Sequence, residues 1–194
     1  MDIIHGGINL EHWESLCPGG LSFVYDDALF RPGTDSFLLG SFPRLKPGAR
    51  VCDLGSGTGL LGLLLLQRQR ELAILFVCHD LALVQSLSHR IMVMYLGVVV
   101  ESLPSSRLAE DALHPYARAL LGSVFSLHDS HEKTIVPLSG EVPSPIDRPA
   151  GCPFHTRCPH CTELCRTQMP QMTVVGPEHW VACHQYSHPA QEAP

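Results

Sequence analysis

The sequence contains little charge and no excess of basic residues. Charged residues make up 16% of the 194 residues and hydrophobic residues 45%, and the formal net charge is -6. Proteins that bind nucleic acid usually gather Lys and Arg on one face, so the charge does not indicate a nucleic-acid partner. The high apolar content favours a folded globular chain over a disordered one.

Long hydrophobic runs and targeting signals are also missing. The longest apolar run, residues 60–66, is broken by Gly62 and is far shorter than the roughly 20 residues that cross a bilayer as a helix. The first residues show neither the basic nor the apolar region of a secretory signal, so we expect a cytosolic protein. Because cytosolic thiols stay reduced, the eight cysteines favour metal ligation over a disulfide scaffold.

Turn residues and apolar periodicity predict an α/β fold with an irregular C-terminal part. The expected strands cover residues 21–25, 50–54 and 72–78, the last of them buried. The expected helices cover residues 35–43, 60–70, 81–88, 104–111 and 115–123. Residues 91–95 and 98–101, which are separated by Gly97, predict a β-hairpin. Residues 137–153 are rich in Pro, Gly and Ser and predict a linker.

A glycine-rich turn joins the strand at residues 50–54 to the following helix. Gly55, Gly57 and Gly59 let the backbone approach a ligand, and the helix start offers free N–H groups. A nucleotide or a related molecule is therefore an expected ligand. The turn lacks the Lys of the GxxxxGK[ST] motif, so it does not supply the usual cation for the phosphates of ATP.

Residues 53–60 resemble motif I of S-adenosylmethionine-dependent methyltransferases. Residues 30–40 resemble the segment before that motif in the tRNA adenine-N6 methyltransferase family, and the whole resemblance covers about residues 10–67. It implies that the three glycines pack against the methionine part of S-adenosylmethionine and that Asp53 helps to hold this cofactor. The acidic residue that binds the ribose and the later Asn-Pro-Pro-Tyr type motif do not follow, so we predict an inactive remnant.

His79 lies just past the strand at residues 72–78. A lone His at such a place is more often a structural hydrogen-bonding residue than a phosphate ligand. Further motifs follow it, and they resemble, in the same order, ATP-binding subunits of dipeptide and oligopeptide ABC importers. These motifs cover residues 79–81, 90–97, 100–101, 114–121, 140–145, 151–159 and 181–184. The resemblance extends over about residues 72–186 and implies that His79 is the switch histidine that contacts the terminal phosphate of ATP.

The resemblance also implies partners and a place in the cell. They are a second ATP-binding subunit and two membrane permeases, at the inner face of the membrane. The Walker A lysine, glutamine loop, signature and Walker B carboxylates normally precede the switch histidine, and methyltransferase-like residues stand there instead. Without a phosphate cradle and a Mg²⁺-holding Asp, we predict no ATP hydrolysis by this chain alone.

Five of the eight cysteines are gathered near the C-terminal end. Cys152, Cys158, Cys165 and Cys183 are enough thiolates for a tetrahedral Zn²⁺ site or a 4Fe-4S cluster, with Cys161 to spare. Structural zinc sites usually show two short CxxC pairs, and only one is present here, which favours the cluster. The importer resemblance agrees, since the C-terminal extension of those subunits looks like a 4Fe-4S module with these four ligands.

Two alternatives to a metal remain, namely reduced buried thiols and a disulfide formed on oxidation. Four histidines lie nearby, and we expect surface imidazoles rather than ligands there. They are His155, His160, His179 and His184.

The sequence therefore predicts two incomplete modules in series. Residues 1–71 form the methyltransferase-like segment, residues 72–125 the C-terminal part of an ABC ATPase-like core, and residues 126–186 the cysteine-rich extension, before a flexible tail at residues 187–194. Three functions are carried forward: an incomplete importer subunit, a methyltransferase remnant, and a non-catalytic metal or iron-sulfur module.

Overall fold

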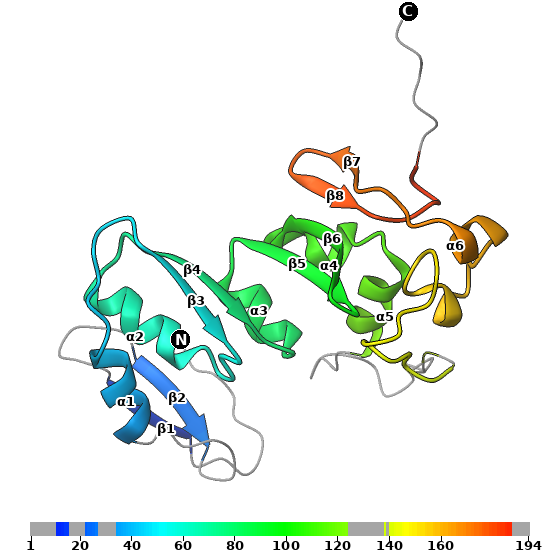
Figure 1. Cartoon of the computed structure of the whole chain (residues 1–194). Helices are drawn as coiled ribbons and strands as arrows, with labels where there is room; N and C mark the ends of the chain where they lie inside the picture. The colour runs from blue at the N-terminus through cyan, green and yellow to red at the C-terminus, as the bar shows by residue number, and fades with distance from the viewer. Residues whose placement is uncertain (1–10, 16–21, 27–33, 124–137, 139, 188–194) are drawn as a thin grey trace, which may run out of the picture. The chain divides into compact units, whose positions relative to one another are not determined.

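The computed structural model describes residues 11–15, 22–26, 34–123, 138 and 140–187 (Figure 1). The chain divides into two compact units, Met1–His79 and Asp80–Pro194. Parallel and antiparallel sheets occur together with helices, so the expected α/β class is confirmed in its coarse form, as a mixed α/β fold. Apart from Ser187, the predicted tail lies outside the described residues.

The first unit begins with an antiparallel strand pair and a helix. β1 (Glu11–Ser15), which the sequence did not predict, pairs with β2 (Ser22–Asp26), close to the strand expected at residues 21–25. α1 (Thr34–Ser41) matches the first expected helix. The guanidinium of Arg68 donates to the carbonyl of Gly40 at 2.5 Å, which ties α1 to the following helix.

The glycine turn connects a parallel pair of strands through a helix. β3 (Arg50–Leu54) lies parallel to β4 (Ala73–Val77), and α2 (Leu60–Arg68) stands between them in sequence. The strand expected from the methyltransferase-like part thus pairs with the first strand of the importer-like part. The helix buries Leu60, Leu64 and Leu65.

The prediction that residues 72–78 form a fully buried strand is wrong. In both strands every second side chain is exposed, and Leu54, at the end of β3, is 78% exposed. Alternate residues of a strand point to opposite faces, and α2 covers only one face of this two-stranded sheet. The face that carries Leu75 and Val77 has no comparable cover among the described residues.

The second unit begins with α3 (Leu81–Leu87), where the carboxylate of Asp80 accepts the backbone N–H of Leu83 at 3.0 Å. β5 (Arg90–Tyr95) and β6 (Val98–Pro104) form the hairpin predicted for this region. Its two-residue turn places Leu96 and Gly97 at φ values of 46° and 77°, a left-handed conformation that matches the strand twist of a hairpin.

The hairpin is extended by two strands from the cysteine-rich part of the chain. β7 (Thr173–Gly176) and β8 (His179–Val181), neither of which was predicted, complete a sheet of order β5-β6-β8-β7. β8 pairs antiparallel with β6. β6, from the segment predicted as residues 72–125, and β8, from the segment predicted as residues 126–186, therefore share one sheet, and Figure 1 shows β7 and β8 beside β6.

Short helices surround this sheet. The helical character expected at residues 104–111 and 115–123 is confirmed by η1 (Ser105–Arg107), α4 (Leu108–Asp111) and α5 (Pro115–Ser123). Two further short helices lie in the cysteine-rich part, namely η2 (His155–Arg157) and α6 (Glu163–Thr167).

The core of the second unit lies between the hairpin, α5 and the cysteine segment. Phe154, 1% exposed, is at its centre. Its ring centroid lies 5.1 Å from that of Tyr95 in β5 and 5.4 Å from that of Tyr116 in α5. Aromatic groups in such edge or tilted contacts add to the stabilisation that comes from burial. The residue between two of the expected ligands thus anchors the cysteine segment to the sheet.

In the described parts of the chain, none of the helices combines the length and the apolar character that crossing a bilayer requires.

Candidate metal centre

The four predicted cysteine ligands come from four different pieces of the second unit. Cys152 precedes η2, Cys158 follows it, Cys165 lies in α6, and Cys183 comes two residues after the end of β8. Three of these residues are buried, and Cys158 is partly buried. The distant spacing in sequence is therefore bridged by the sheet and by the aromatic core.

Gly151 allows two of the cysteine segments to approach one another. Its φ is +70°, and a Cβ there would lie only 2.4 Å from the carbonyl oxygen of Cys165. The neighbouring N–H of Cys152 donates to that same oxygen at 2.8 Å. A side chain at position 151 would therefore force the two segments apart, which is a constraint that the sequence reading missed.

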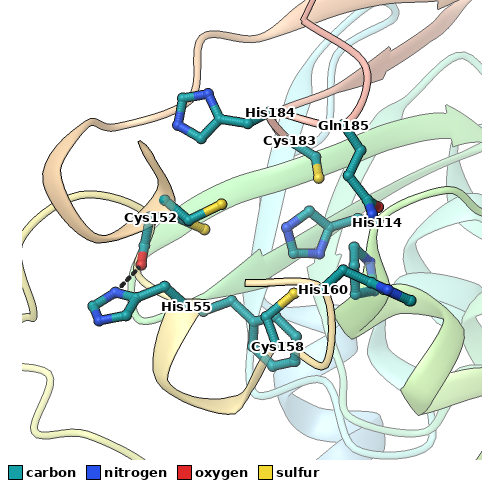
Figure 2. Close-up of a pocket in the computed structure, with 11 residues that line it drawn as sticks. His114, Cys152, His155, Cys158, His160, Cys183, His184 and Gln185 are labelled. Atoms are coloured by element: carbon teal, nitrogen blue, oxygen red, sulfur yellow. Dashed lines mark hydrogen bonds between the residues drawn. The ribbon is translucent and has the colours of Figure 1, made fainter. Parts of the chain in front are cut away.

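The four thiols line one pocket, together with several imidazoles (Figure 2). Cys161 does not line it. Its Sγ instead donates to the carbonyl of Thr162 at 3.5 Å. The structure thus brings together the four cysteines chosen from the sequence and leaves out the fifth.

Polar groups lie near each of the four sulfurs. Backbone hydrogen bonding at Phe154, His160 and Gln185 lowers the pKa of the thiols two residues before them, at Cys152, Cys158 and Cys183. The hydroxyl of Thr162 lies 3.2 Å from the Sγ of Cys165. Such donors stabilise negative charge on sulfur, so the site is prepared for thiolates.

Burial nevertheless opposes that charge when no cation is present. It raises the pKa of the Cys152 thiol to about 11, and the pKa values of Cys158 and Cys183 are raised for the same reason. The neighbouring thiols add mutual repulsion to each of these shifts. A bound cation would reverse both effects, because metals bind the thiolate form.

The donor set fits a soft metal or an iron-sulfur cluster, but the thiols do not form a closed single-ion site. In the described residues, no group of three or more His, Cys, Asp or Glu side chains is placed to hold one metal ion directly. Four thiolates around a Zn²⁺ ion all lie about 2.3 Å from it. Thiolates around a four-iron cluster stand farther apart, because each binds a different iron.

The histidines near the site have other hydrogen-bond partners or are exposed. Nδ1 of His155 lies 2.8 Å from the carbonyl of Cys152, and Nε2 of His184 lies 2.9 Å from that of Gln168. His160 is exposed. The expectation of a surface imidazole is wrong for His179, which is 3% exposed because its Nε2 meets the Glu101 carboxylate at 2.8 Å.

Glu101 and His114 form a buried polar network beside the pocket that sequence reasoning missed. The fully buried carboxylate of Glu101 accepts the backbone N–H groups of Leu113 at 2.7 Å and His114 at 3.0 Å. Burial lowers the pKa of His114 to about 4. The available sequence signal was a His-Pro pair at the start of an expected helix, a position that favours a capping side chain.

The glycine turn of the first unit has the geometry expected of a ligand-binding loop. Gly55 and Gly57 adopt φ values of 79° and 53°, with open space where a Cβ would lie. Gly59 is the N-cap of α2 at φ 74°. Asp53 has a buried Oδ2 with no hydrogen-bond partner among the described residues, and burial raises the pKa of its carboxyl.

His79 is exposed in the turn after β4. The preceding Cys78 donates its thiol hydrogen to the carbonyl of Gly57 at 3.3 Å, so the end of β4 lies against the glycine turn. A position at the end of a parallel strand suits a phosphate-contacting group. The glycine turn nevertheless contains no Lys for the phosphates of ATP.

A family comparison matches part of the second unit. A family model described as the C-terminal region of oligopeptide/dipeptide transporters matches residues 100–165. The oligopeptide transport ATP-binding protein AppF of Bacillus subtilis is 44% identical over 124 residues, which is 63% of this chain and 38% of that protein. The di/tripeptide transport ATP-binding protein DppF of Pseudomonas aeruginosa is 41% identical over 119 residues, 61% of this chain and 36% of that protein.

A putative peptide import ATP-binding protein of Brucella abortus is 46% identical over 121 residues, covering 62% of this chain and 35% of that protein. The chain thus spans little more than a third of the length of these relatives. The matched family region contains Cys152, Cys158 and Cys165, and Cys183 lies beyond it. It begins after the glycine turn, so the methyltransferase resemblance gains no support from it and stays a prediction.

Proposed function

We infer that this chain is an incomplete ATP-binding subunit of a dipeptide or oligopeptide importer. The inference rests on the relation of residues 100–165 to the C-terminal part of peptide ABC transporter ATP-binding subunits. The function that it retains is to hold a 4Fe-4S cluster, or alternatively Zn²⁺, between Cys152, Cys158, Cys165 and Cys183. The observation that carries this proposal is the single pocket that these thiols share.

The residues of the chain prepare the pocket for such a group. Gly151 keeps the backbone of Cys152 against that of Cys165. Backbone hydrogen bonding lowers the pKa of three of the thiols, and the Thr162 hydroxyl lies 3.2 Å from the Sγ of Cys165. When bound, the metal group cross-links segments that are distant in sequence, and this gives it a structural role in holding β8 and α6 together.

The cysteine spacing favours a cluster over a single zinc ion, because only one short CxxC pair is present. The four thiols line one pocket, and in the described residues no group of three or more His, Cys, Asp or Glu side chains is placed to hold one metal ion. Zinc binding would require the thiols to close in on one point.

ATP hydrolysis is not part of the proposal for this chain alone. His79 keeps the place of a switch histidine, but the residues before it supply no Walker lysine and no Mg²⁺-holding carboxylate pair. Phosphoryl transfer depends on those groups for positioning and for charge stabilisation. A second ATP-binding subunit and permease subunits at the inner face of the membrane are the proposed partners, by analogy with relatives whose names describe them as peptide transport ATP-binding proteins.

A second candidate function is residual binding of S-adenosylmethionine at the glycine turn. Asp53 favours it, because a buried carboxylate oxygen without a donor is available to a ligand amine or hydroxyl. The open space at Gly55 and Gly57 would accommodate a close approach. Activity is not expected, since the ribose-binding acid and the adenine-orienting motif are missing.

The test is anaerobic purification followed by iron, sulfide and zinc analysis. We expect about four iron and four sulfide per chain, as a 4Fe-4S cluster contains. Cys158→Ser should remove most of this iron, and the matched control Cys161→Ser, outside the pocket, should retain it. Protein free of iron and zinc would contradict the metal centre.

The same preparations separate the remaining readings. ATP turnover that His79→Ala abolishes would contradict the predicted inactivity. Calorimetric binding of S-adenosylmethionine that Asp53→Ala weakens would support the second candidate. Metal binding without either ligand would leave the non-catalytic metal module as the function of the chain.

A further inference from the structure

His114 occupies a fixed place in the cysteine pocket. It is 1% exposed and lines the pocket with the four thiols, and Figure 2 shows its imidazole projecting into this space. The residue stands directly before α5 and caps that helix. Its Nδ1 accepts the backbone N–H of Tyr116 at 3.1 Å, and its carbonyl accepts that of Arg118 at 3.1 Å.

The cap determines which ring nitrogen carries the proton. Nδ1 accepts a hydrogen bond from a backbone N–H, which is always a donor, so Nδ1 has no hydrogen of its own. A neutral imidazole carries its single hydrogen on the other nitrogen. His114 therefore presents an Nε2–H to its surroundings, and it has no Nε2 lone pair with which to bind a metal.

Within the described residues, the hydrogen bonds of His114 involve its Nδ1 and its backbone, and none involves Nε2. The Nε2–H at the pocket is therefore available to an acceptor that binds there. The pocket that it faces is lined by sulfurs, which accept hydrogen bonds best when they are thiolates or the sulfides of a cluster.

Glu101 and Phe154 hold this imidazole in position. The carboxylate of Glu101 accepts the backbone N–H of His114 at 3.0 Å and is itself bound by His179. The ring centroid of Phe154 lies 5.7 Å from that of His114. The ring is thus held by the Tyr116 N–H at Nδ1 and by Phe154 at its side, while Glu101 holds the backbone of the same residue.

We propose that His114 is a positioning residue whose Nε2–H donates a hydrogen bond to a sulfur of the metal group held by the four cysteines. This rests on the proposed function of the pocket. The donor stabilises the negative charge that thiolates and sulfides carry, and this charge increases when a cluster is reduced. The bond therefore tightens metal binding and raises the reduction potential of a bound cluster.

Two substitutions separate this role from helix capping. Asn at position 114 places its amide oxygen near Nδ1, so His114→Asn keeps an acceptor for Tyr116 but removes the donor at the far side of the ring. Gln is longer and places its amide near Nε2, so His114→Gln keeps a donor to the pocket and weakens the cap. A purely structural role predicts that the Gln variant is the impaired one.

The experiment reconstitutes the full chain anaerobically with ferrous iron and sulfide, and separately with Zn²⁺. Loss of an outer hydrogen bond to a metal site typically costs 10- to 100-fold in affinity. We therefore expect His114→Asn to lose iron to a chelator about tenfold faster than the unchanged chain, and to show a lower reduction potential. His114→Gln should keep both properties close to those of the unchanged chain.

Three outcomes overturn the assignment. They are equal iron retention and potential in His114→Asn and the unchanged chain, impairment of His114→Gln alone, and nitrogen-15 shifts of His114 that place the hydrogen on Nδ1. Failure of the unchanged chain to take up iron or zinc would overturn the proposed metal centre as well. Circular dichroism of both variants checks that the second unit keeps its fold.

Discussion

The two units differ in how completely their strands are covered. In the second unit β5 and β6 bury one face on the aromatic core and gain β8 as a neighbour. In the first unit β3 and β4 pair only with each other among the described residues, and their outer face exposes apolar side chains. Among the described residues, the second unit, which resembles a single family, therefore has the more completely covered sheet, and the first unit, which joins segments that resemble two families, has the less covered one.

The largest expected effect comes from comparing the truncation of a leucine in each unit. Leu103 in β6 is 0% exposed and Leu54 in β3 is 78% exposed. Truncation of a buried leucine costs about 2 to 5 kcal/mol because it leaves a cavity, whereas exposed substitutions usually stay within about 0.5 kcal/mol. We expect Leu103→Ala to lower the free energy of unfolding by the larger amount and Leu54→Ala to leave it almost unchanged.

The two tryptophans allow each unit to be followed separately in urea. Trp13 belongs to the first unit and Trp180 to the second. Fluorescence in a Trp13→Phe background reports Leu103→Ala, and fluorescence in a Trp180→Phe background reports Leu54→Ala. A comparable loss for both leucines would mean that the outer face of β3 is covered.

The next test concerns the buried network of the second unit. Glu101 accepts three hydrogen bonds in the interior, while Glu178 pairs with Arg90 at 2.9 Å on the surface. Glu101→Gln would turn an amide N–H toward a backbone N–H, and hydrogen bonds to a charged group are worth about 1.5 to 3 kcal/mol. We therefore expect Glu101→Gln to lower the free energy of unfolding by about that amount. Glu178→Gln should lower it by less than about 1 kcal/mol, because exposed ion pairs contribute little.

Urea unfolding followed through Trp180 compares these two variants, after a check that each keeps the circular dichroism of the unchanged chain. Trp180 also contacts Arg90, at 5.0 Å from its ring centroid, so the Glu178 control tests whether the probe itself is disturbed. Equal stability of both variants would show that the Glu101 network does not hold β6, α5 and β8 together.

Local sequence patterns were enough to predict most elements of both units. The Gly97 turn predicted the hairpin, and the glycines after residue 54 predicted the turn before α2. β7 and β8 were missed because strands of four and three residues carry almost no periodic signal, and pairing with β6 is what stabilises them. The burial of residues 72–78 was overestimated because sequence does not reveal how many strands a sheet has.

Some residues of the candidate site could likewise be predicted from the sequence, and others depend on contacts made only in the folded chain. Cysteine clustering and the importer resemblance together indicated the four thiols that line the pocket, and their role as metal ligands stays a prediction. The roles of Gly151, Glu101 and His114 depend on segments that meet only in the folded chain. No local pattern in the sequence could have connected Glu101 to His179, which is 78 positions away.

The smallest expected effect concerns Asp53 in the first unit, and its sign follows from the carboxyl pKa. Burial raises the folded-state pKa of Asp53 above the ordinary value of 3.8. The stabilisation that this shift gives is therefore present below 3.8 and lost as pH rises through the folded-state pKa. At neutral pH the ionised carboxylate lowers the stability of the folded unit. We therefore expect Asp53→Asn to unfold at slightly higher urea than the unchanged chain, with the advantage disappearing as the pH falls below 3.8.

Urea unfolding, followed through Trp13 fluorescence in the Trp180→Phe background, measures this difference in stability, and Asp35→Asn, at a carboxyl in α1, is the control. Lower stability of Asp53→Asn at neutral pH would mean that a cationic partner meets this carboxylate, and the glycine turn would then be a completed structural turn and not an open ligand site.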